Sequence, residues 1–392
     1  MKKLLIFLII THLLLTINSS GANQNSDNTN NKNEKTLKIG VLLPLSGEYE
    51  NVGQSFLKAI QLALHDIKNK NITIYPKDNK GDALNSYLAA KEFAELGIEI
   101  VIGPIFYENI ERLDEIKNIT FISFTNNTEK IPENVIAFGV NIESQIYALK
   151  KYFDKIKISK TLLLSPESEF IYQSESVAKK DILKFYRTYK YDVNPKKITA
   201  NIEKITKYRD RKKDLERRIK ILEKSDLYKD KQELKKLEQM HTLGKVNFDS
   251  VVILDFGERL KSVLTSFMFS DVSSNEVNFF TINQWFDRSF FNENAMQNLH
   301  FPSINLKNLL KFNKKYLDSF NENPNEVSIL AYDALGLIYY CWNTNNHKFE
   351  SEQLYNQDGF KGLHSEFFIE KNLSKQKLKI YKVANKKFIN VH

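Results

Sequence analysis

Residues 38–64 read KIGVLLPLSGEYENVGQSFLKAIQLAL, and this stretch constrains the fold more than any other part of the chain. Residues 39–43 are a short apolar run that Pro44 ends, which is typical of a parallel strand covered by helices on both faces. Ser46 and Gly47 favour a turn directly afterwards. The folded part of the chain is therefore predicted to open with a buried strand and a polar turn.

An amphipathic helix is expected next. Asn51 can cap it, with Gln54 three residues further on completing a capping box. Five apolar residues then recur at helical spacing on one face: Phe56, Ile60, Ala63, Leu64 and Ile67. This face predicts packing of the helix against the sheet.

Strand-like runs recur with helix-like segments between them, which predicts an α/β fold with a parallel sheet. The first four runs are residues 39–43, 72–75, 99–102 and 119–124. Ligands of such sheets bind beyond the carboxyl ends of the strands. The loops expected there are residues 44–49, 77–82, 103–109 and 125–128.

A second α/β series begins after residue 141, so the chain is expected to form two lobes, each a parallel sheet flanked by helices. Its expected helices and strands are 142–156, 161–165, 172–186, 250–254 and 279–282, followed by helices at 306–320 and 326–342 and a strand pair at 365–370 and 378–383. Three crossings between the lobes are expected, near residues 140, 284 and 362. The predicted lobe 1 is thus 36–140 and 283–362, and lobe 2 is 141–282 and 363–392.

An insert in lobe 2, residues 203–243, is predicted to be a helical hairpin that turns near residues 225–230. Fifteen Lys and Arg against nine Asp and Glu lie between residues 203 and 245, so the insert carries most of the chain's formal charge of +9. The sequence allows three roles for the insert: a solvated arm packed along lobe 2, a docking surface for another protein, or attraction to a membrane surface. Codon bias in an AT-rich genome explains the wider abundance of Lys, Asn and Ile better than binding of nucleic acid does.

The first residues predict export to the periplasm. Lys2 and Lys3 precede an apolar run over residues 4–15, and small residues follow, as in a signal peptide at 1–22; an uncleaved anchor is the alternative. Residues 23–35 are polar and predict a disordered tether. The only cysteine, Cys341, lies in an apolar stretch, so we expect it in the core, with no disulfide and no acylated cysteine at the signal end.

Enzymatic chemistry is not expected. The histidines have no metal-ligand spacing, and the scattered glycines form no phosphate-binding loop, so neither a metal nor a cofactor is predicted. Asp66, Asp78 and Asp82 are explained by a helix surface and by turns. The sequence favours a binding protein over a catalyst.

Several stretches together resemble the type I periplasmic binding proteins, and within them the leucine/isoleucine/valine-binding group of ABC transporter proteins. They are the opening segment 38–64, the turn with Asp78, Gly81 and Asp82, IGP at 102–104, FISF at 121–124, AYDAL at 331–335 and GFKG at 359–362. A subgroup, the penicillin-binding protein activators, is similar in the charged insert, in residues 248–264 and in TINQWFD at 281–287. The resemblance implies a two-lobed fold with a ligand site between the lobes.

The resemblance also implies site residues. The loop that holds the ligand carboxylate corresponds here to residues 105–108, which contain Tyr107 and no serine. The second polar contact region corresponds to Ser123, Thr125 and Asn126, and Ser46 lies in the first loop. The aromatic lid corresponds to Phe170 and Tyr172, and the acidic partner of the ammonium group to Glu258. Ordinary loop capping is the alternative role for each residue.

Two functions follow from these observations. One is a non-enzymatic periplasmic protein that captures a small solute, such as an amino acid, for an ABC importer. The other is a regulator of peptidoglycan synthesis that contacts a synthase through a protein-facing surface.

Overall fold

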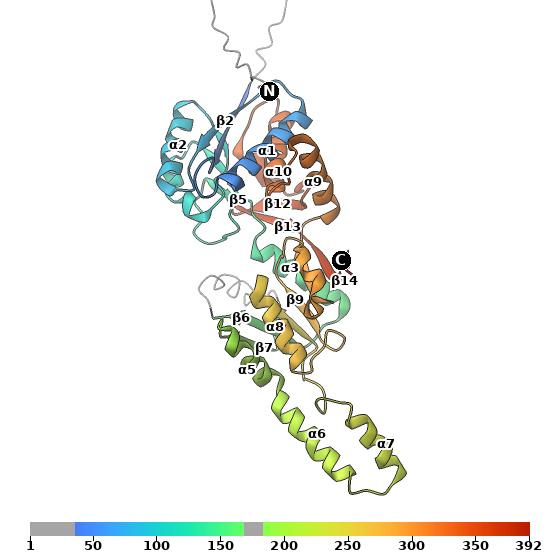
Figure 1. The fold of residues 1–392 in the computed structure, drawn as a ribbon. Helices are drawn as coiled ribbons and strands as arrows, with labels where there is room; N and C mark the ends of the chain where they lie inside the picture. Colours follow the sequence, from blue (N-terminus) through green and yellow to red (C-terminus); the bar gives the residue numbers. More distant parts are fainter. Residues whose placement is uncertain (1–35, 168–182) are drawn as a thin grey trace, which may run out of the picture. The chain divides into compact units, whose positions relative to one another are not determined.

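The computed structural model describes residues 36–167 and 183–392, which form two sheets flanked by helices (Figure 1). The predicted signal peptide and tether, residues 1–35, lie outside the described residues. The same holds for most of the helix predicted over 172–186; its described part, residues 183–186, is not helical.

The first sheet has the strand order β11-β12-β13-β5-β4-β3-β1-β2. Its strands are β1 (Leu37–Leu43), β2 (Ile72–Asp78), β3 (Ile100–Ile102), β4 (Thr120–Ser123), β5 (Val135–Ala137), β11 (Phe360–Lys361), β12 (Glu366–Glu370) and β13 (Leu373–Lys377). Strands β1 to β5 pair in parallel, whereas β11, β12 and β13 pair antiparallel with one another. The predicted parallel sheet is thus confirmed and gains an antiparallel edge.

Both faces of the first sheet are buried, as the apolar run of β1 predicts. Val41 and Leu43 join the core on the face covered by α1 (Glu50–Ile67) and α10 (Ile329–Thr344), while Leu42 joins the core under α2 (Ala83–Glu95). Gly40 lies beneath α2, because a Cβ atom there would meet the ring of Phe93 at 3.2 Å.

The second sheet has the order β15-β14-β10-β9-β8-β6-β7. Its strands are β6 (Thr161–Pro166), β7 (Arg187–Tyr191), β8 (Ser250–Ile253), β9 (Asn278–Thr281), β10 (His300–Ser303), β14 (Lys379–Ala384) and β15 (Lys387–Asn390). The first five are parallel, and β14 and β15 extend the sheet antiparallel.

The other long helices that the structure describes in the two lobes are α3 (Ile142–Ile156), α5 (Pro195–Thr206), α8 (Gly257–Phe269) and α9 (Leu306–Phe320). Short 3-10 helices are η1 (Tyr107–Ile110), η2 (Leu113–Glu115), η4 (Arg288–Asn292), η5 (Asn294–Met296) and η6 (Ser351–Tyr355).

The helical hairpin predicted in the insert is confirmed as α6 (Tyr208–Leu222) and α7 (Tyr228–Leu237) (Figure 1). Leu215, Leu222 and Leu237 form a small core between its helices. At its base the buried Arg211 donates to Thr242 Oγ1 at 2.8 Å and to the carbonyl of Ser270 at 2.5 Å. The hairpin therefore has its own core and a polar anchor to the second lobe.

The sheets correct two of the three predicted crossings. The first lies between β5 of the first sheet and β6 of the second, a stretch that includes residue 140. The second was expected near residue 284, but β10 still pairs within the second sheet, so the chain leaves that lobe between β10 and α9. The third was expected near residue 362, but β11 to β13 belong to the first sheet, so it lies at Leu378. The predicted strand pair is consequently wrong, because β12 and β14 belong to different sheets.

The predicted start of the first helix is also corrected. Helix α1 begins at Glu50 with Tyr49 at the N-cap position and no side-chain cap, so Asn51 lies inside the helix. Gln54 instead donates to the carbonyl of Leu45 at 3.3 Å. The first turn of α1 packs closely against the loop after β1. A Cβ atom on Gly53 would lie 1.9 Å from the carbonyl oxygen of Pro44, so only glycine fits at this position.

Candidate functional site

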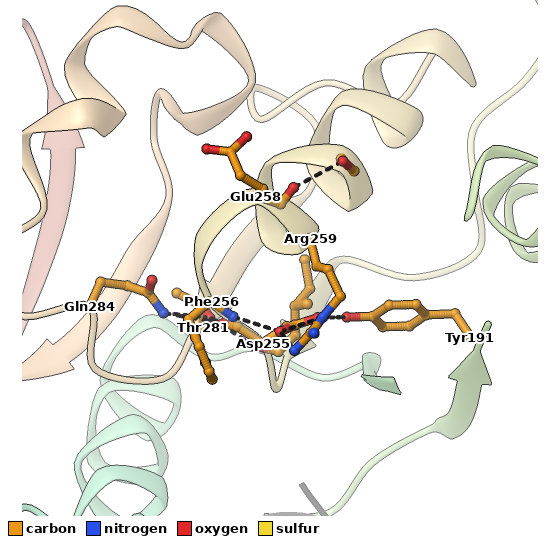
Figure 2. Close-up of polar contacts among 9 residues, drawn as sticks. Tyr191, Asp255, Phe256, Glu258, Arg259, Thr281 and Gln284 are labelled. Atoms are coloured by element: carbon orange, nitrogen blue, oxygen red, sulfur yellow. Dashed lines mark hydrogen bonds and ion pairs between the residues drawn. The ribbon is translucent and has the colours of Figure 1, made fainter. Parts of the chain in front are cut away.

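A cluster of polar side chains lies at the carboxyl edge of the second sheet, where parallel sheets bind ligands. Tyr191 ends β7, Thr281 ends β9, and Asp255 follows β8. Arg259 comes from the first turns of α8, and Gln284 comes from the loop after β9. We call these five residues the Asp255 cluster (Figure 2).

The carboxylate of Asp255 is fully buried and fully bonded. The hydroxyl of Tyr191 donates to it at 2.5 Å. Arg259 donates through Nε at 3.0 Å and through Nη2 at 2.9 Å, which is the two-pronged geometry that makes guanidinium-carboxylate pairs strong. Burial of Tyr191, together with the neighbouring carboxylate, raises the pKa of its hydroxyl, so it stays a donor.

Hydrogen bonds also hold the backbone of the loop between β8 and α8, in which Asp255 lies. Thr281 Oγ1 donates to the carbonyl of Asp255 at 2.8 Å, and Gln284 Nε2 donates to the same oxygen at 3.1 Å. Side chains from β9 and the following loop therefore fix the position from which Arg259 extends.

Arg259 is the member of the cluster that is available for binding. Its side chain is 38% exposed, and hydrogen bonding to Asp255 raises its pKa, which keeps it charged. Its Nη1 donates no hydrogen bond to any of the described residues. The centroid of the exposed Phe256 ring lies 5.9 Å from the guanidinium carbon of Arg259. A fixed guanidinium next to an aromatic ring suits a carboxylate or phosphate group.

The candidates at the carboxyl edge of the first sheet are occupied by structural bonds. Ser46 Oγ donates to Asp78 at 2.5 Å, and the backbone N–H of Leu45 donates to the same carboxylate at 2.8 Å. Partial burial alone would raise the pKa of Asp78, but these hydrogen bonds hold it below its usual value. Ser46 thus ties the loop after β1 to the end of β2.

Ser123 and Thr125 are both buried. Ser123 Oγ donates to the carbonyl of Pro104 at 2.9 Å, and Thr125 Oγ1 accepts from the N–H of Asn127 at 3.1 Å. The Ser123 hydroxyl thus links the end of β4 to the loop after β3, whereas the Thr125 hydroxyl is bonded within its own loop. Asn126, the next residue after Thr125, is exposed.

Tyr107 packs against the core beneath α2. Beside it, Phe106 and Tyr49 form a ring pair with centroids 4.6 Å apart, and Gly81 lies against Tyr49, where an added Cβ atom would come within 2.9 Å of the ring. Aromatic side chains therefore cover this part of the edge.

Glu258 is directed away from the Asp255 cluster (Figure 2). Its side chain is 87% exposed and pairs with Lys261 at 2.8 Å, at one end of a groove of about 330 Å³ between α5 and α8. Among the described residues, no hydrogen bond joins it to the candidates of the first sheet. Phe170 and Tyr172 lie outside the described residues.

Sequence reasoning singled out Glu258 and missed Asp255 and Arg259 in the same segment, ILDFGER. The available signal was an acid directly after a buried strand with an arginine four residues later, because those two positions meet across the first turn of a helix.

Within residues 36–167 and 183–392, no group of acidic, histidine and cysteine side chains is arranged to hold a metal ion. No helix in these ranges has the length and apolar content to cross a membrane.

Two parallel-dominated sheets with helices on their faces, joined by three crossings, define the class of two-lobed periplasmic binding folds. Residues 36–193 match the family described as periplasmic binding protein. An uncharacterized protein of Rickettsia prowazekii (strain Madrid E) is 24% identical over 213 residues, which cover 52% of this chain and 56% of that protein. The chain thus matches little more than half the length of this relative.

Solved structures of two kinds share the fold. A putative branched-chain amino acid ABC transporter protein from Rhodospirillum rubrum has a TM-score of 0.69 at 13% identity, over 91% of this chain and 100% of that one. The C-domain of LpoA from Haemophilus influenzae, a regulator of PBP1A, has a TM-score of 0.61 at 14% identity over the same shares. LivJ from Streptococcus pneumoniae, in complex with isoleucine, has a TM-score of 0.53 at 14% identity, again over 91% and 100%.

The predicted resemblance to the type I periplasmic binding proteins is confirmed, and this chain has their two-lobed fold. The solved structures that share this fold include a substrate-binding protein in complex with isoleucine and a regulator of PBP1A.

Proposed function

We propose that this chain is a non-enzymatic periplasmic binding protein that captures a small solute bearing a carboxylate or similar anionic group for an ABC importer. The observation that carries the proposal is the fixed, partly exposed guanidinium of Arg259 at the carboxyl edge of the second sheet.

The geometry of the ion pair supports this role. Asp255 uses both oxygens on Arg259 and Tyr191, so it has little capacity left for a ligand, whereas Arg259 keeps the donors of Nη1. A guanidinium that is already oriented loses little conformational entropy when an anion binds. The neighbouring ring of Phe256 adds apolar contact for the rest of the solute.

The ligand class differs from the one expected from sequence alone. Glu258 was expected to bind an ammonium group, but its carboxylate points away from the cluster and pairs with Lys261. Ser123 and Thr125 were expected to bind through their hydroxyls, which are buried and bonded to the backbone. We therefore assign recognition of an anionic group to Arg259.

Thermal unfolding of the purified protein against amino acids, dicarboxylates, short peptides and cell-wall fragments tests the proposal. A ligand at a hundred times its dissociation constant adds about 2.7 kcal/mol to the free energy of unfolding, which raises the melting temperature by roughly a few degrees. The shift should disappear in Arg259→Gln and weaken in Arg259→Lys, which keeps the charge beside Asp255. Arg217→Gln, on the hairpin with its side chain 72% exposed, is the matched control and should keep the shift. If no compound shifts unfolding, the proposal fails.

A second candidate function, regulation of a peptidoglycan synthase by protein contact, is favoured by the far end of the hairpin. Ile221, Leu227 and Tyr228 are 56%, 67% and 78% exposed there, amid basic side chains. Large apolar side chains with such exposure are common where partners dock. Binding of a purified synthase should be lost in Leu227→Ser/Tyr228→Ser and kept in Arg259→Gln; equal binding by both variants would reject this role for the hairpin.

A further inference from the structure

The turn between α6 and α7 lies at the end of the hairpin that is remote from its polar anchor. Arg211 holds the base of α6, and Ile221 follows ten residues later in the same helix, about 15 Å away at the rise of an α-helix. Ile221, Leu227 and Tyr228 flank this turn, and each keeps more than half of its surface exposed. We call these three residues the hairpin tip.

Hydrogen bonds fix the turn that carries the hairpin tip. Ser225 Oγ donates to the carboxylate of Asp230, and the N–H of Leu227 donates to Ser225 Oγ at 3.3 Å. The N–H of Lys231 then donates to the carbonyl of Leu227 at 3.1 Å, which starts α7. Leu222 belongs to the small core of the hairpin, whereas the tip residues stay outside that core. Their exposure is therefore built into a bonded turn.

The hairpin is also strongly basic. Twelve Lys and Arg lie in residues 208–237 against seven Asp and Glu, an excess of five positive charges. Its arginines are in use, because Arg211 holds the base and Arg209, Arg217 and Arg218 pair with acids. Lys231 pairs with Asp226. The other lysines have no ion-pair partner among the residues that the structure describes; they are Lys212, Lys213, Lys220, Lys224, Lys229, Lys235 and Lys236.

Unpaired lysines beside exposed apolar side chains favour a lipid surface over a protein surface. Lysine is depleted at protein interfaces, where arginine is preferred because its guanidinium makes directed pairs. An ammonium group on a flexible stem is attracted by a layer of anionic headgroups without a fixed partner, and each one strengthens binding roughly fivefold. Apolar side chains enter the boundary between headgroups and acyl chains, and the ring of a tyrosine suits that depth.

We propose that the hairpin tip binds the surface of a bilayer that contains anionic phospholipid. Leu227 and Tyr228 enter the headgroup boundary, and Ile221 adds apolar contact from the end of α6. Lys224 and Lys229, which flank the turn and are exposed, lie against the lipid phosphates. The attachment is peripheral and does not involve the Asp255 cluster.

Sedimentation of the purified protein with lipid vesicles tests the proposal. The vesicles are made of phosphatidylcholine, either alone or mixed with phosphatidylglycerol. Binding should be at least about tenfold stronger to the vesicles that contain phosphatidylglycerol, because several unpaired lysines act together. It should weaken as the salt concentration rises, since salt screens these charges.

Loss of the apolar side chains should weaken the attachment. Leu227→Ser/Tyr228→Ser removes most of the apolar area of the hairpin tip, so binding to the anionic vesicles should fall by about tenfold or more. Both side chains are exposed and lie outside the small core, so the variant should fold as the unchanged protein does. Circular dichroism checks that its helix content is kept.

Loss of the lysines should weaken the attachment only where the lipid is anionic. Lys224→Gln/Lys229→Gln should bind the vesicles with phosphatidylglycerol about tenfold or more weakly. Lys311→Gln/Lys314→Gln, which removes two exposed lysines from α9, is the matched control for net charge and should bind as the unchanged protein does.

The proposal is overturned by equal binding to the two kinds of vesicle, by equal binding of the hairpin and α9 lysine variants, or by full binding in Leu227→Ser/Tyr228→Ser. Absence of vesicle binding, with capture of a purified synthase that this last variant loses, would assign the hairpin tip to a protein instead. Arg259→Gln should bind vesicles as the unchanged protein does, so failure here is distinguishable from failure of the solute site.

Discussion

Asp255 and Arg259 lie four residues apart and join through two hydrogen bonds, Nε to one carboxylate oxygen at 3.0 Å and Nη2 to the other at 2.9 Å. The carboxylate is fully buried, whereas the guanidinium reaches the surface. The pair gives the buried carboxylate its hydrogen-bond donors and leaves part of the guanidinium exposed to solvent. The edge of the second sheet therefore offers a positively charged group in a fixed orientation.

Removal of the buried acid should destabilise the fold. Asp255→Asn breaks the ion pair and weakens the bond from Tyr191, which we expect to lower the free energy of unfolding by about 2 to 3 kcal/mol; the cost stays below that of a wholly buried pair because Arg259 is partly solvated. Asp214→Asn removes an exposed partner of Arg217 on α6 and should cost less than about 0.5 kcal/mol. Urea unfolding measures both, and equal effects would contradict this account of Asp255.

His300 should make stability depend on pH. Burial lowers the pKa of His300 from 6.5 to about 4, so the unfolded chain takes up this proton first. The free energy of unfolding should therefore fall as pH drops from 6.5 to about 4, by at most about 1.4 kcal/mol per pH unit, and this contribution should level off below. His300→Phe keeps a ring beside Phe280 and should lack this slope in urea unfolding at several pH values; the same slope in both proteins would refute the assignment.

Asn141 should matter more than an ordinary helix cap. It accepts from the N–H of Ser144 at 2.9 Å and donates to the carbonyl of Ser374 in β13 at 2.5 Å, while almost fully buried. Asn141→Ala should cost about 2 to 3 kcal/mol, since a cap is lost and a buried carbonyl loses its donor. Asn194→Ala removes the exposed cap of α5 and should cost about 1 kcal/mol. Thermal or urea unfolding compares the two, and a smaller cost at Asn141 would be inconsistent with its role at the first crossing.

Arg211 should control the order of the hairpin. Its guanidinium donates to Thr242 Oγ1 and to the carbonyl of Ser270, which joins the base of α6 to the segment after α8. Arg211→Met removes the donor to both acceptors, so hydrogen exchange in residues 208–237 and protease cleavage between α6 and α7 should both become faster. Arg217→Met, on the exposed face of α6, should leave both rates unchanged. Identical rates in the two variants would show that the small leucine core alone holds the hairpin.

Much of the fold could be predicted because apolar runs mark strands that are buried on both faces. Residues 39–43 and 250–254 became β1 and β8, and 306–320 became α9 with the same ends. Strand β13, LSKQK, has no such run: it takes its place through backbone pairing with β12 and β5, which local sequence does not encode. Because β13 was not predicted, the third crossing was placed too early in the chain. For the same reason β12 and β14 were predicted to pair, although they belong to different sheets.

The site was harder to predict because sequence gives the residue type at a strand end but not the partners of its side chain. Ser46, Ser123 and Thr125 lie at the expected edge of the first sheet, where their hydroxyls hold the loops together. At the corresponding edge of the second sheet, Arg259 is bonded to Asp255 through Nε and Nη2, and its guanidinium stays partly exposed. Only the three-dimensional structure separates a bonded hydroxyl from a guanidinium whose Nη1 donates to none of the residues that the structure describes.

The central claim, recognition of an anionic solute by Arg259, is tested most directly by isothermal titration of the compound that gives the largest thermal shift into the unchanged protein, Arg259→Gln and Arg217→Gln. We predict one saturable site, lost or weakened at least about tenfold in Arg259→Gln and unchanged in Arg217→Gln. Equal affinity in all three proteins would place the solute elsewhere and contradict the account.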